Sequence, residues 1–530
     1  MRRRTALKAG AITCAVALLG SLAACGGSKE PTTTADGKPI VSVLVVKRPA
    51  TDKIANMQWA KDLEADCDCK IEWQEVSEDA WAQQKNATLA AGKIADVSLH
   101  AFFPANAAQF PGLFEDLSKD LDKMPNVKQF FKEKPDAQKL TTDPEGHMYA
   151  LPSSRGKSYS GTGQHMFINK TWLDKLGLQV PTTWDELENV LKAFKTQDPN
   201  GNGQADEIPM NIRKLDSYFT YYSPMLLLNS TGIVTGFNKG ASPTGFYAKN
   251  GVVKSFLTSD EYKEVVKYYH KLISEGLIPA DWATKTFDAC DTDQLSDGKT
   301  AKTGVSFGWS QDASFGTLKD QYIPIPVPSA PGVSPDKTVW DGSSSEFDAA
   351  GPAVSARAAN KDATLKLLNL MYSEKYSVQQ FYGSFGKTVT KTGEHEYTVD
   401  NDKLIEMRKK NTSPSLSYPA GWIPDEVTIK GDAGSDALYQ ASKVYEKQRS
   451  NFDPVKDYIP DYVNPDADDN TTLASNYNQI SNVAMQKTAT WMSKGGIDEE
   501  WDAYCKQLDS LGLQENVKIW QKWYDIYTKK

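Results

Sequence analysis

The sequence predicts an α/β fold with a mainly parallel sheet, because strand-like apolar runs alternate with helical patterns near the N-terminus. The strand-like runs cover residues 41–46, 70–73 and 95–99. Helical patterns cover residues 52–64 and 79–91 between them. A β-α-β-α-β order of this kind needs crossover helices, which make the strands parallel within one sheet.

The ends of these strands hold the first candidate ligand contacts. In open α/β sheets, ligands bind at the carboxyl ends of the strands. Lys47 and Arg48 follow the first predicted strand, and His100, Phe102 and Phe103 follow the third. We therefore expect these five side chains at a binding site.

Length and charge narrow the class of partner. The chain has 530 residues, enough for about two to four domain-sized units with buried cores. It carries 60 Lys and Arg against 68 Asp and Glu, a formal net charge of -8. Nucleic-acid binding needs clustered basic residues that displace counterions, and the sequence has no basic stripe. We expect a polar or neutral ligand and no nucleic-acid partner.

The first 24 residues have the pattern of a lipoprotein signal peptide. A basic stretch, residues 2–8, precedes an apolar run, residues 9–24, that is short for a membrane-spanning helix. Leu-Ala-Ala-Cys at residues 22–25 resembles the lipobox of bacterial lipoproteins, in which Cys25 receives a diacylglyceryl group and becomes the N-terminus. Residues 25–39 then form a flexible polar tether. This predicts a protein held at the extracellular face of the cell membrane, exported by either the general or the twin-arginine route.

Four cysteines remain once the signal segment is removed and Cys25 is lipidated. They are Cys67, Cys69, Cys290 and Cys505, too few for a disulfide scaffold in a chain of this length. Cys67 and Cys69 lack the C-x-x-C spacing typical of redox and zinc sites. One or two disulfides and unpaired core cysteines both remain open.

A family signature follows a Gly- and Ser-rich stretch at residues 153–161, which predicts a crossover between lobes. In the signature, residues 169–187, Gly177 closes one helix and Thr183 caps the next, with Glu186 completing a capping box. The segment resembles the signature block of the extracellular solute-binding proteins of bacterial ABC importers, sugar-binding family 1. Other blocks resemble the same family in the same order, at residues 146–152, 274–279, 304–309 and 360–364.

The resemblance implies the two-lobe, type II fold of periplasmic binding proteins, in which hinge strands join two α/β lobes around a ligand cleft. We expect residues 40–153 and 327–371 in the N-terminal lobe, and residues 154–326 and 372–530 in the C-terminal lobe. The resemblance also implies a monomeric binding protein without catalysis that delivers its ligand to the permease of an ABC transporter. A ligand that bridges both lobes would favour the closed form.

Residues 198–207 predict a structural calcium site. Side-chain oxygens alternate along this glycine-bearing loop, as a hard cation requires. The loop matches the first half of an EF-hand, but Pro209 stands where the bidentate acid belongs, so Glu207 must supply that acid. The loop resembles the shortened calcium loop of alginate-binding and related long members of the family. The predicted ligands are Asp198, Asn200, Asn202, Gln204, Asp206 and Glu207.

The aromatic content favours a carbohydrate ligand. The chain has 13 Trp and 23 Tyr, and sugar recognition sets aromatic faces against the C–H faces of pyranose rings while polar groups hold the hydroxyls. We expect Trp501, Trp520 and Trp523, in the C-terminal helical region, in the core. Loop residues beside polar groups are the better candidates for ligand contact: Arg155, Tyr159, Arg213, Tyr222, Trp309, Asp312, Trp340, Asp341 and Trp422.

Enzymatic motifs are absent or incomplete. The sequence has no H-E-x-x-H, and the G-x-S-x-G match at residues 304–308 runs into Trp309 instead of opening a helix. Paired carboxylates across a cleft would suit glycoside hydrolysis, so a secreted, calcium-stapled glycosidase is the alternative function. A peptide or another small solute is the alternative ligand. The length of the chain and the loop at residues 458–470 favour an oligosaccharide over a monosaccharide.

Overall fold

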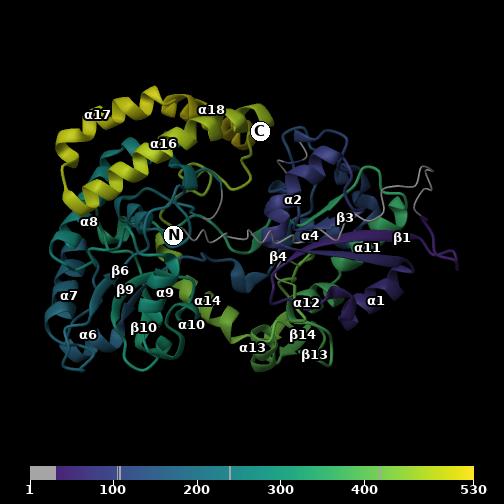
Figure 1. The fold of residues 1–530 in the computed structure, drawn as a ribbon, viewed down its shortest axis with the longest axis horizontal. Helices are drawn as coiled ribbons and strands as arrows, with labels where there is room; N and C mark the ends of the chain where they lie inside the picture. Colours follow the sequence, from purple (N-terminus) through teal and green to yellow (C-terminus); the bar gives the residue numbers. More distant parts are fainter. Residues whose placement is uncertain (1–30, 104–105, 107–108, 238–239, 417–418, 530) are drawn as a thin grey trace, which may run out of the picture.

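The computed structural model describes residues 31–103, 106, 109–237, 240–416 and 419–529. Two α/β lobes lie side by side, each built around its own four-stranded sheet (Figure 1). No helix among the described residues is long and apolar enough to cross a membrane. The predicted signal segment and Cys25 lie outside these residues.

The N-terminal lobe contains the parallel sheet that the sequence predicts. Its strand order is β12-β3-β1-β2. β1 (Ile40–Lys47) pairs in parallel with β2 (Lys70–Ser77) and β3 (Val97–Leu99). β12 (Pro352–Val354) returns to this sheet from much later in the chain and runs antiparallel to β3.

Two crossover helices, α1 (Gln58–Cys67) and α2 (Glu78–Ala91), confirm the predicted β-α-β-α-β order. The first begins later than residue 52 because a 3-10 turn at Ile54–Asn56 precedes it. This lobe also contains α4 (Pro125–Glu133), α5 (Pro135–Lys139), α11 (Lys361–Met371), α12 (Glu374–Tyr382), α13 (Asn401–Lys409) and a small sheet of β13 (Val389–Gly393), β14 (Glu396–Val399) and β15 (Thr428–Lys430).

A disulfide joins Cys67 to Cys69 between α1 and β2. Asp68 between them adopts the left-handed conformation, with φ 53°. Cys290, which is buried, and Cys505, which is half-buried, are the free cysteines of the described chain. Of the possibilities left open by the sequence, the structure therefore contains one local bridge and two unpaired thiols.

The C-terminal lobe is built on a mixed sheet with the order β10-β5-β9-β6. β5 (His165–Asn169) runs antiparallel to both β10 (Tyr322–Ile325) and β9 (Thr303–Gly308). β6 (Ile208–Asn211) pairs in parallel with β9. The mainly parallel sheet predicted for the first lobe is therefore not repeated in the second.

The family signature folds into α6 (Lys170–Leu176) and α7 (Trp184–Thr196), as predicted. Gly177 ends α6 with φ 67°, and the Thr183 hydroxyl accepts a bond from the Glu186 N–H at 3.2 Å. The Glu186 carboxylate accepts bonds from the N–H and hydroxyl of Thr182, at 2.7 and 2.8 Å. In a regular capping box the Glu186 carboxylate would accept the N–H of the cap residue, Thr183. Here it accepts the N–H of the residue before the cap.

The C-terminal helices cover this lobe in a yellow layer (Figure 1). Trp501, Trp520 and Trp523 are buried in its core, as predicted. The remaining elements of the lobe are α8 (Asp260–Ser274), α9 (Phe287–Leu295), α10 (Gln311–Phe315), α14 (Ala433–Lys443), α15 (Glu446–Arg449), α16 (Ala467–Lys494), α17 (Ile497–Ser510), α18 (Leu513–Thr528) and the hairpin of β7 (Phe246–Lys249) and β8 (Val252–Ser255).

Two short strands join the lobes: β4 (Ser153–Ser154) pairs antiparallel with β11 (Phe347–Asp348). The first of them coincides with the start of the predicted crossover. Because both strands pass between the two sheets, they can serve as the hinge on which a cleft opens and closes.

The hydrophobic cores divide the chain differently from the sequence-based boundaries. Val327 and Trp340 pack in the core of the C-terminal lobe, not the N-terminal one. Tyr372 and Trp422 pack in the core of the N-terminal lobe, with α12 and the β13–β15 sheet beside them. A segment belongs to the lobe in which it buries its apolar side chains. On this basis the chain passes between the lobes near residues 347 and 430 and not at 327 and 372.

Candidate ligand-binding cleft

A cavity of about 950 Å³ lies between the lobes, within the size range of ligand-binding pockets. We call it the ligand cleft. Both lobes and the hinge strand β11 contribute side chains to it. Its lining consists of Arg48, Ala50, Thr51, Phe103, Leu140, Arg155, Tyr159, Tyr221, Tyr222, Gly240, Trp309, Ser344, Ser345, Phe347, Asp348, Ala349, Phe381, Arg408, Ser413, Ser415, Leu416, Asp461 and Asn464.

Some of the predicted contacts line this cleft. The Arg155 guanidinium lies 5.7 Å from the centroid of the Tyr159 ring. Burial raises the pKa of Tyr159 to about 12, so its hydroxyl stays protonated and able to donate a hydrogen bond. Phe103 is 53% exposed, so much of its side chain is accessible to a ligand in the cleft. The predicted residues that line the cleft are Arg48, Phe103, Arg155, Tyr159, Tyr222 and Trp309.

Trp309 depends on a glycine for its position in the wall. It follows β9 directly, and its ring lies against Gly163, just before β5. A Cβ atom at Gly163 would lie 2.3 Å from the indole. Only glycine therefore permits this close approach.

His100 lies at the edge of the cleft, next to the hinge. Its Nδ1 is 3.5 Å from the carboxylate of Asp348, which lines the cleft. Burial lowers the pKa of His100, although Asp348 acts in the opposite direction. The imidazole is therefore mainly neutral near pH 7. The strand-end rule predicts His100 at the binding site, and the structure places it close to the cleft but not among the lining residues.

Arg213 supports the cleft from behind. Its guanidinium lies 4.8 Å from the centroid of the Tyr222 ring, and its Nη2 contacts both carboxylate oxygens of Asp291, at 2.7 and 3.0 Å. Charged and stacked in this way, Arg213 holds the aromatic residue instead of lining the cavity itself.

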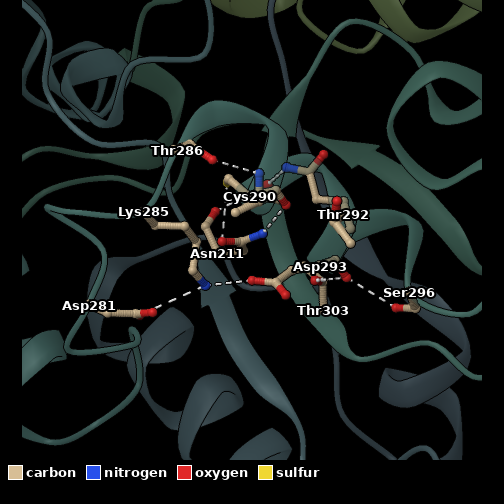
Figure 2. A network of polar contacts seen from close by, with 12 residues as sticks. Asn211, Asp281, Lys285, Thr286, Cys290, Thr292, Asp293, Ser296 and Thr303 are labelled. Carbon is tan, nitrogen blue, oxygen red and sulfur yellow. Dashed lines mark hydrogen bonds and ion pairs between the residues drawn. The ribbon is translucent and has the colours of Figure 1, made fainter. Parts of the chain in front are cut away.

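A polar network fixes the helix that carries Asp291 (Figure 2). Asn211, at the end of β6, donates its amide to the Cys290 carbonyl at 2.9 Å. Lys285 pairs with Asp293 at 2.5 Å and with Asp281 at 3.8 Å. These contacts anchor α9 to the sheet, so they set the position of the Asp291–Arg213 pair against Tyr222.

Three predicted contacts are core residues instead. Phe102 is 1% exposed and packs edge-on against Trp81 and Phe114. Trp340 is fully buried and stacks on a neighbouring tyrosine, and Trp422 stacks on a phenylalanine. Tertiary packing covers the segments that the sequence pattern suggested as loops, so these rings do not face the cleft.

The remaining predicted contacts are engaged elsewhere. Lys47 pairs with Glu75 at 2.6 Å, and Asp312 pairs with Lys319 at 2.8 Å. Asp341 is fully buried and accepts a bond from the Gln164 amide at 2.8 Å. None of these three predicted residues is part of the cleft lining.

Sequence reasoning missed several lining residues. Phe381 and Arg408 come from α12 and α13, which had been assigned to the other lobe. Phe347 and Asp348 belong to a hinge strand of two residues, too short to give a periodic pattern. Asp461 lies in the loop at residues 458–470, whose length was the one signal that pointed to this region.

The predicted calcium loop is a compact turn between α7 and β6. Asp198 accepts backbone N–H bonds from Gly201 and Asn202 through Oδ1, at 3.0 and 3.1 Å. Asp206 pairs with Lys302 at 2.9 Å and accepts the amide groups of Asn200 and Asn202. Oxygen donors of the type that calcium prefers are therefore concentrated here.

Glu207 has the property expected of an incomplete cation site. Its Oε1 is buried without a hydrogen-bond partner among the described residues. Burial raises the pKa of Glu207, and the charges of Asp198 and Asp206 act in the same direction. A cation would offset both the lost hydration and the repulsion, so the residues present fit the predicted ion.

Another group of possible metal ligands lies at the turn between β13 and β14. Ligand atoms of Glu374, His395 and Glu426 lie within 4.8 Å of one another. His395 Nδ1 contacts the Glu374 carboxylate at 2.6 Å, which raises the pKa of the imidazole. These side chains thus already satisfy one another as an ion pair.

The family model of the bacterial extracellular solute-binding proteins matches residues 51–378, more than half of the chain. The chain belongs to this family. The resemblance and the two-lobe fold stated from the sequence are therefore confirmed. The family consists of extracellular binding proteins and not of enzymes.

Similar proteins agree with this assignment. The fructooligosaccharide ABC transporter substrate-binding protein FusA of Streptococcus pneumoniae serotype 4 is 27% identical over 551 residues, covering 96% of each chain. A solved FusA structure with kestose is 25% identical, covers 92% of this chain and 99% of that one, and has a TM-score of 0.75.

Structures from Bifidobacterium longum infantis are more similar. One, from ATCC 15697, is described as an HMO-binding, ABC-transporter-associated solute-binding protein. It is 88% identical, covers 93% of this chain and 100% of that one, and has a TM-score of 0.93. Another structure, described as an extracellular solute-binding protein, is 75% identical, covers 94% of this chain and 100% of that one, and has a TM-score of 0.93. This family member is thus the substrate-binding protein of an ABC sugar importer.

Proposed function

We propose that this protein binds a milk oligosaccharide between its lobes and delivers it to the permease of its importer. The observation that carries the proposal is the cleft of about 950 Å³, which combines aromatic residues with charged and hydroxyl groups. Tyr222, Trp309 and Phe381 suit the apolar faces of sugar rings, and Arg155 and Asp348 suit their hydroxyls. The 88% identical structure described as HMO-binding supports this ligand class.

Binding shifts the protein toward a closed form. The lining of the cleft comes from both sides of the β4–β11 hinge, so a ligand gains its full set of contacts only when the lobes approach each other. The free energy of these extra contacts favours the closed form over the open form. The permease recognises the closed form. No bond in the sugar is broken.

The protein is held at the extracellular face of the membrane as a monomer with a lipid on Cys25. The basic stretch, apolar run and lipobox-like residues 22–25 support this anchor. Lipoprotein LipO of Bacillus subtilis is 37% identical to this chain over 119 aligned residues. The described end of the predicted tether, residues 32–39, is instead a turn held to the N-terminal lobe, where the Thr32 carbonyl accepts bonds from the Ile40 N–H at 2.9 Å and from the Asn360 amide at 2.6 Å. The residues between Cys25 and this turn would therefore link the lipid to the lobes.

Calcium in the loop at residues 198–207 serves as a structural cofactor. The buried Glu207 oxygen and the surrounding donors support it. A FusA structure is described as an EF-hand mutant, so a loop of this kind has been named in a relative. Asp198, Asn200, Asn202, Gln204, Asp206 and Glu207 would hold the ion, which lies apart from the cleft lining.

Calorimetric titration tests the ligand, with lacto-N-tetraose, kestose and a tripeptide as probes and product analysis after each run. We expect saturable binding of lacto-N-tetraose at one site and recovery of the intact sugar. Binding of kestose alone would assign a fructooligosaccharide ligand, and binding of the tripeptide alone would overturn the carbohydrate assignment. Release of shorter sugars would instead favour the glycosidase alternative.

A further inference from the structure

A second cavity, of about 270 Å³, lies next to the ligand cleft. We call it the side chamber. Leu140 and Asn464 line both cavities, so the two spaces adjoin. Neither the hinge nor any ligand contact proposed above uses the side chamber.

The N-terminal lobe supplies one wall as a rigid loop after α5. Asp143 accepts backbone N–H bonds from Glu145 and His147, at 3.0 and 2.8 Å, and its Oδ2 contacts His147 Nδ1 at 3.1 Å. The His147 and Tyr149 rings lie 5.9 Å apart. These bonds fix the His147 side chain, beside the Tyr149 ring, before any ligand arrives.

The C-terminal lobe supplies the opposite wall from α18. Trp523 donates its indole N–H to Asp469 at 2.7 Å, which ties α18 to α16. The Tyr527 ring lies 6.4 Å from the Trp523 ring and 6.2 Å from the Tyr462 ring. Because Trp523 is buried in the core and Tyr527 is half-buried, Tyr527 has more surface to offer to the chamber.

The chemistry of the walls favours one neutral sugar unit. The lining combines Phe110, Tyr149 and Tyr527 with the carboxylates of Asp143 and Glu145. Aromatic faces and carboxylate acceptors suit the C–H face and the hydroxyls of a pyranose ring. Among the described residues, the lining contains no lysine or arginine and three carboxylates, those of Asp143, Glu145 and Asp466, so a sialic acid or uronic acid would be repelled by these groups.

The side chamber is much smaller than the ligand cleft, about 270 against about 950 Å³. Its volume lies at the lower edge of the range for complete ligand pockets, which begins at about 300 Å³. A single ring suits this space better than a whole oligosaccharide. The adjoining cleft is the place from which the rest of such a ligand would enter.

We propose that the side chamber is an accessory subsite for one neutral sugar unit of an oligosaccharide whose other units occupy the ligand cleft. This rests on the proposed function and extends it to chain length. The protein then binds a chain that reaches the chamber more tightly than a shorter chain of the same series. An acidic unit at the same end of the chain brings no such gain.

The test is a calorimetric series with lactose, lacto-N-tetraose, lacto-N-hexaose and a sialylated lacto-N-tetraose. The variants are Tyr149→Ala and Tyr527→Ala, one from each wall. Tyr218→Ala is the matched control, because Tyr218 is 42% exposed and lines neither cavity. Thermal unfolding verifies that each variant is folded, and two walls provide two independent variants.

We expect wild-type affinity to rise between lactose and the longest neutral sugar. Each wall variant should lose about three- to tenfold in affinity for that longest sugar, the value of one aromatic contact, and keep its affinity for lactose. The control should keep both. Sialylation of lacto-N-tetraose should add no affinity.

Other outcomes overturn the subsite. An equal loss for every sugar would make the chamber a contact that closes the lobes, and no loss for any sugar would make it empty space. Sugar binding without any length dependence removes the subsite and leaves the proposed function intact. If the wild-type protein binds none of these sugars, the proposed ligand class fails and the subsite fails with it.

Discussion

Gln164 donates its side-chain amide to the buried carboxylate of Asp341, with 2.8 Å between Nε2 and Oδ2. Its other amide atom, Oε1, accepts a bond from the backbone N–H of Tyr222 at 3.0 Å. Tyr222 lines the cleft with a left-handed backbone, φ 63°. Asp341, predicted from sequence to touch the ligand, is therefore a positioning residue one step behind the cleft wall.

Replacing Gln164 with alanine should weaken both the fold and ligand binding. The change leaves a buried carboxylate with one donor fewer and frees a strained backbone N–H, so we expect a loss of about 1–3 kcal/mol in the free energy of unfolding. Chemical denaturation measures this loss, and calorimetry measures the accompanying loss of sugar affinity. The control is Gln514→Ala, because Gln514 makes its amide bond at the surface. Equal stability of the two variants would contradict the role assigned to Gln164.

Asp341 should also make stability depend on pH. Burial raises its pKa to about 6 from the ordinary 3.8, although Ser343 and Arg449 favour the ionised form. The folded protein then holds this proton more tightly than the unfolded chain. The contribution to the free energy of unfolding is therefore fully present below pH 3.8 and is lost as the pH rises through 6.

The size of this effect follows from the two pKa values. The difference corresponds to about 3 kcal/mol between acid and neutral pH. Asp341→Asn removes the titrating group. The difference in free energy of unfolding between wild type and variant should therefore change between pH 3.8 and pH 6, while the contributions of all other titratable groups cancel in that difference. Denaturation curves at pH 4, 5, 6 and 7 measure it, and a difference that stays constant with pH would show that Asp341 is ionised throughout.

Local sequence signals predicted the elements well. Gly177 and Thr183 end and begin helices where expected, because a left-handed glycine and a capping hydroxyl act within one turn of the chain. The strand-end rule brought Arg48 and Phe103 to the cleft for a different reason: the parallel pairing of β1 and β3 sets their carboxyl ends at the same edge of the sheet. The alternation of strands and helices along the chain was enough to predict that pairing.

Contacts between segments far apart in the chain determine which aromatic and charged residues face the cleft, and the sequence does not reveal these contacts. Trp340 and Trp422 look like loop aromatics, but segments distant in the chain bury them. Phe381 and Arg408 reach the cleft only because their helices join the N-terminal lobe. No local sequence pattern indicates that the chain stays in the N-terminal lobe after residue 372. The predicted lobe boundaries at residues 327 and 372 therefore lie too early in the chain.

Gly163→Ala should weaken ligand binding by displacing Trp309. The added Cβ would lie 2.3 Å from the indole, which must move out of its place in the cleft wall. We expect a loss of about threefold to tenfold in sugar affinity, the value of one aromatic contact. Calorimetry measures the change in affinity. Gly434→Ala is the matched control, because its Cβ would meet nothing closer than 3.7 Å, and similar affinities for both variants would separate Trp309 from ligand binding.

Removal of calcium should destabilise the protein through the loop at residues 198–207. An ion bound only by the folded state adds about 2.7 kcal/mol when its concentration is one hundred times Kd. A chelator such as EDTA should therefore lower Tm, and added Ca²⁺ should restore it. Differential scanning calorimetry of the purified protein measures both steps.

Variants connect this effect to the loop. Asp198→Asn and Glu207→Gln each remove a charge that the ion would offset, so their Tm should already be low in Ca²⁺ and change little with EDTA. Asp320→Asn, at an exposed site outside the loop, should respond to EDTA as the wild type does. The absence of any EDTA effect on wild-type Tm would mean that the loop folds without an ion, held by the backbone bonds to Asp198, the amide bonds to Asp206 and the Asp206–Lys302 pair.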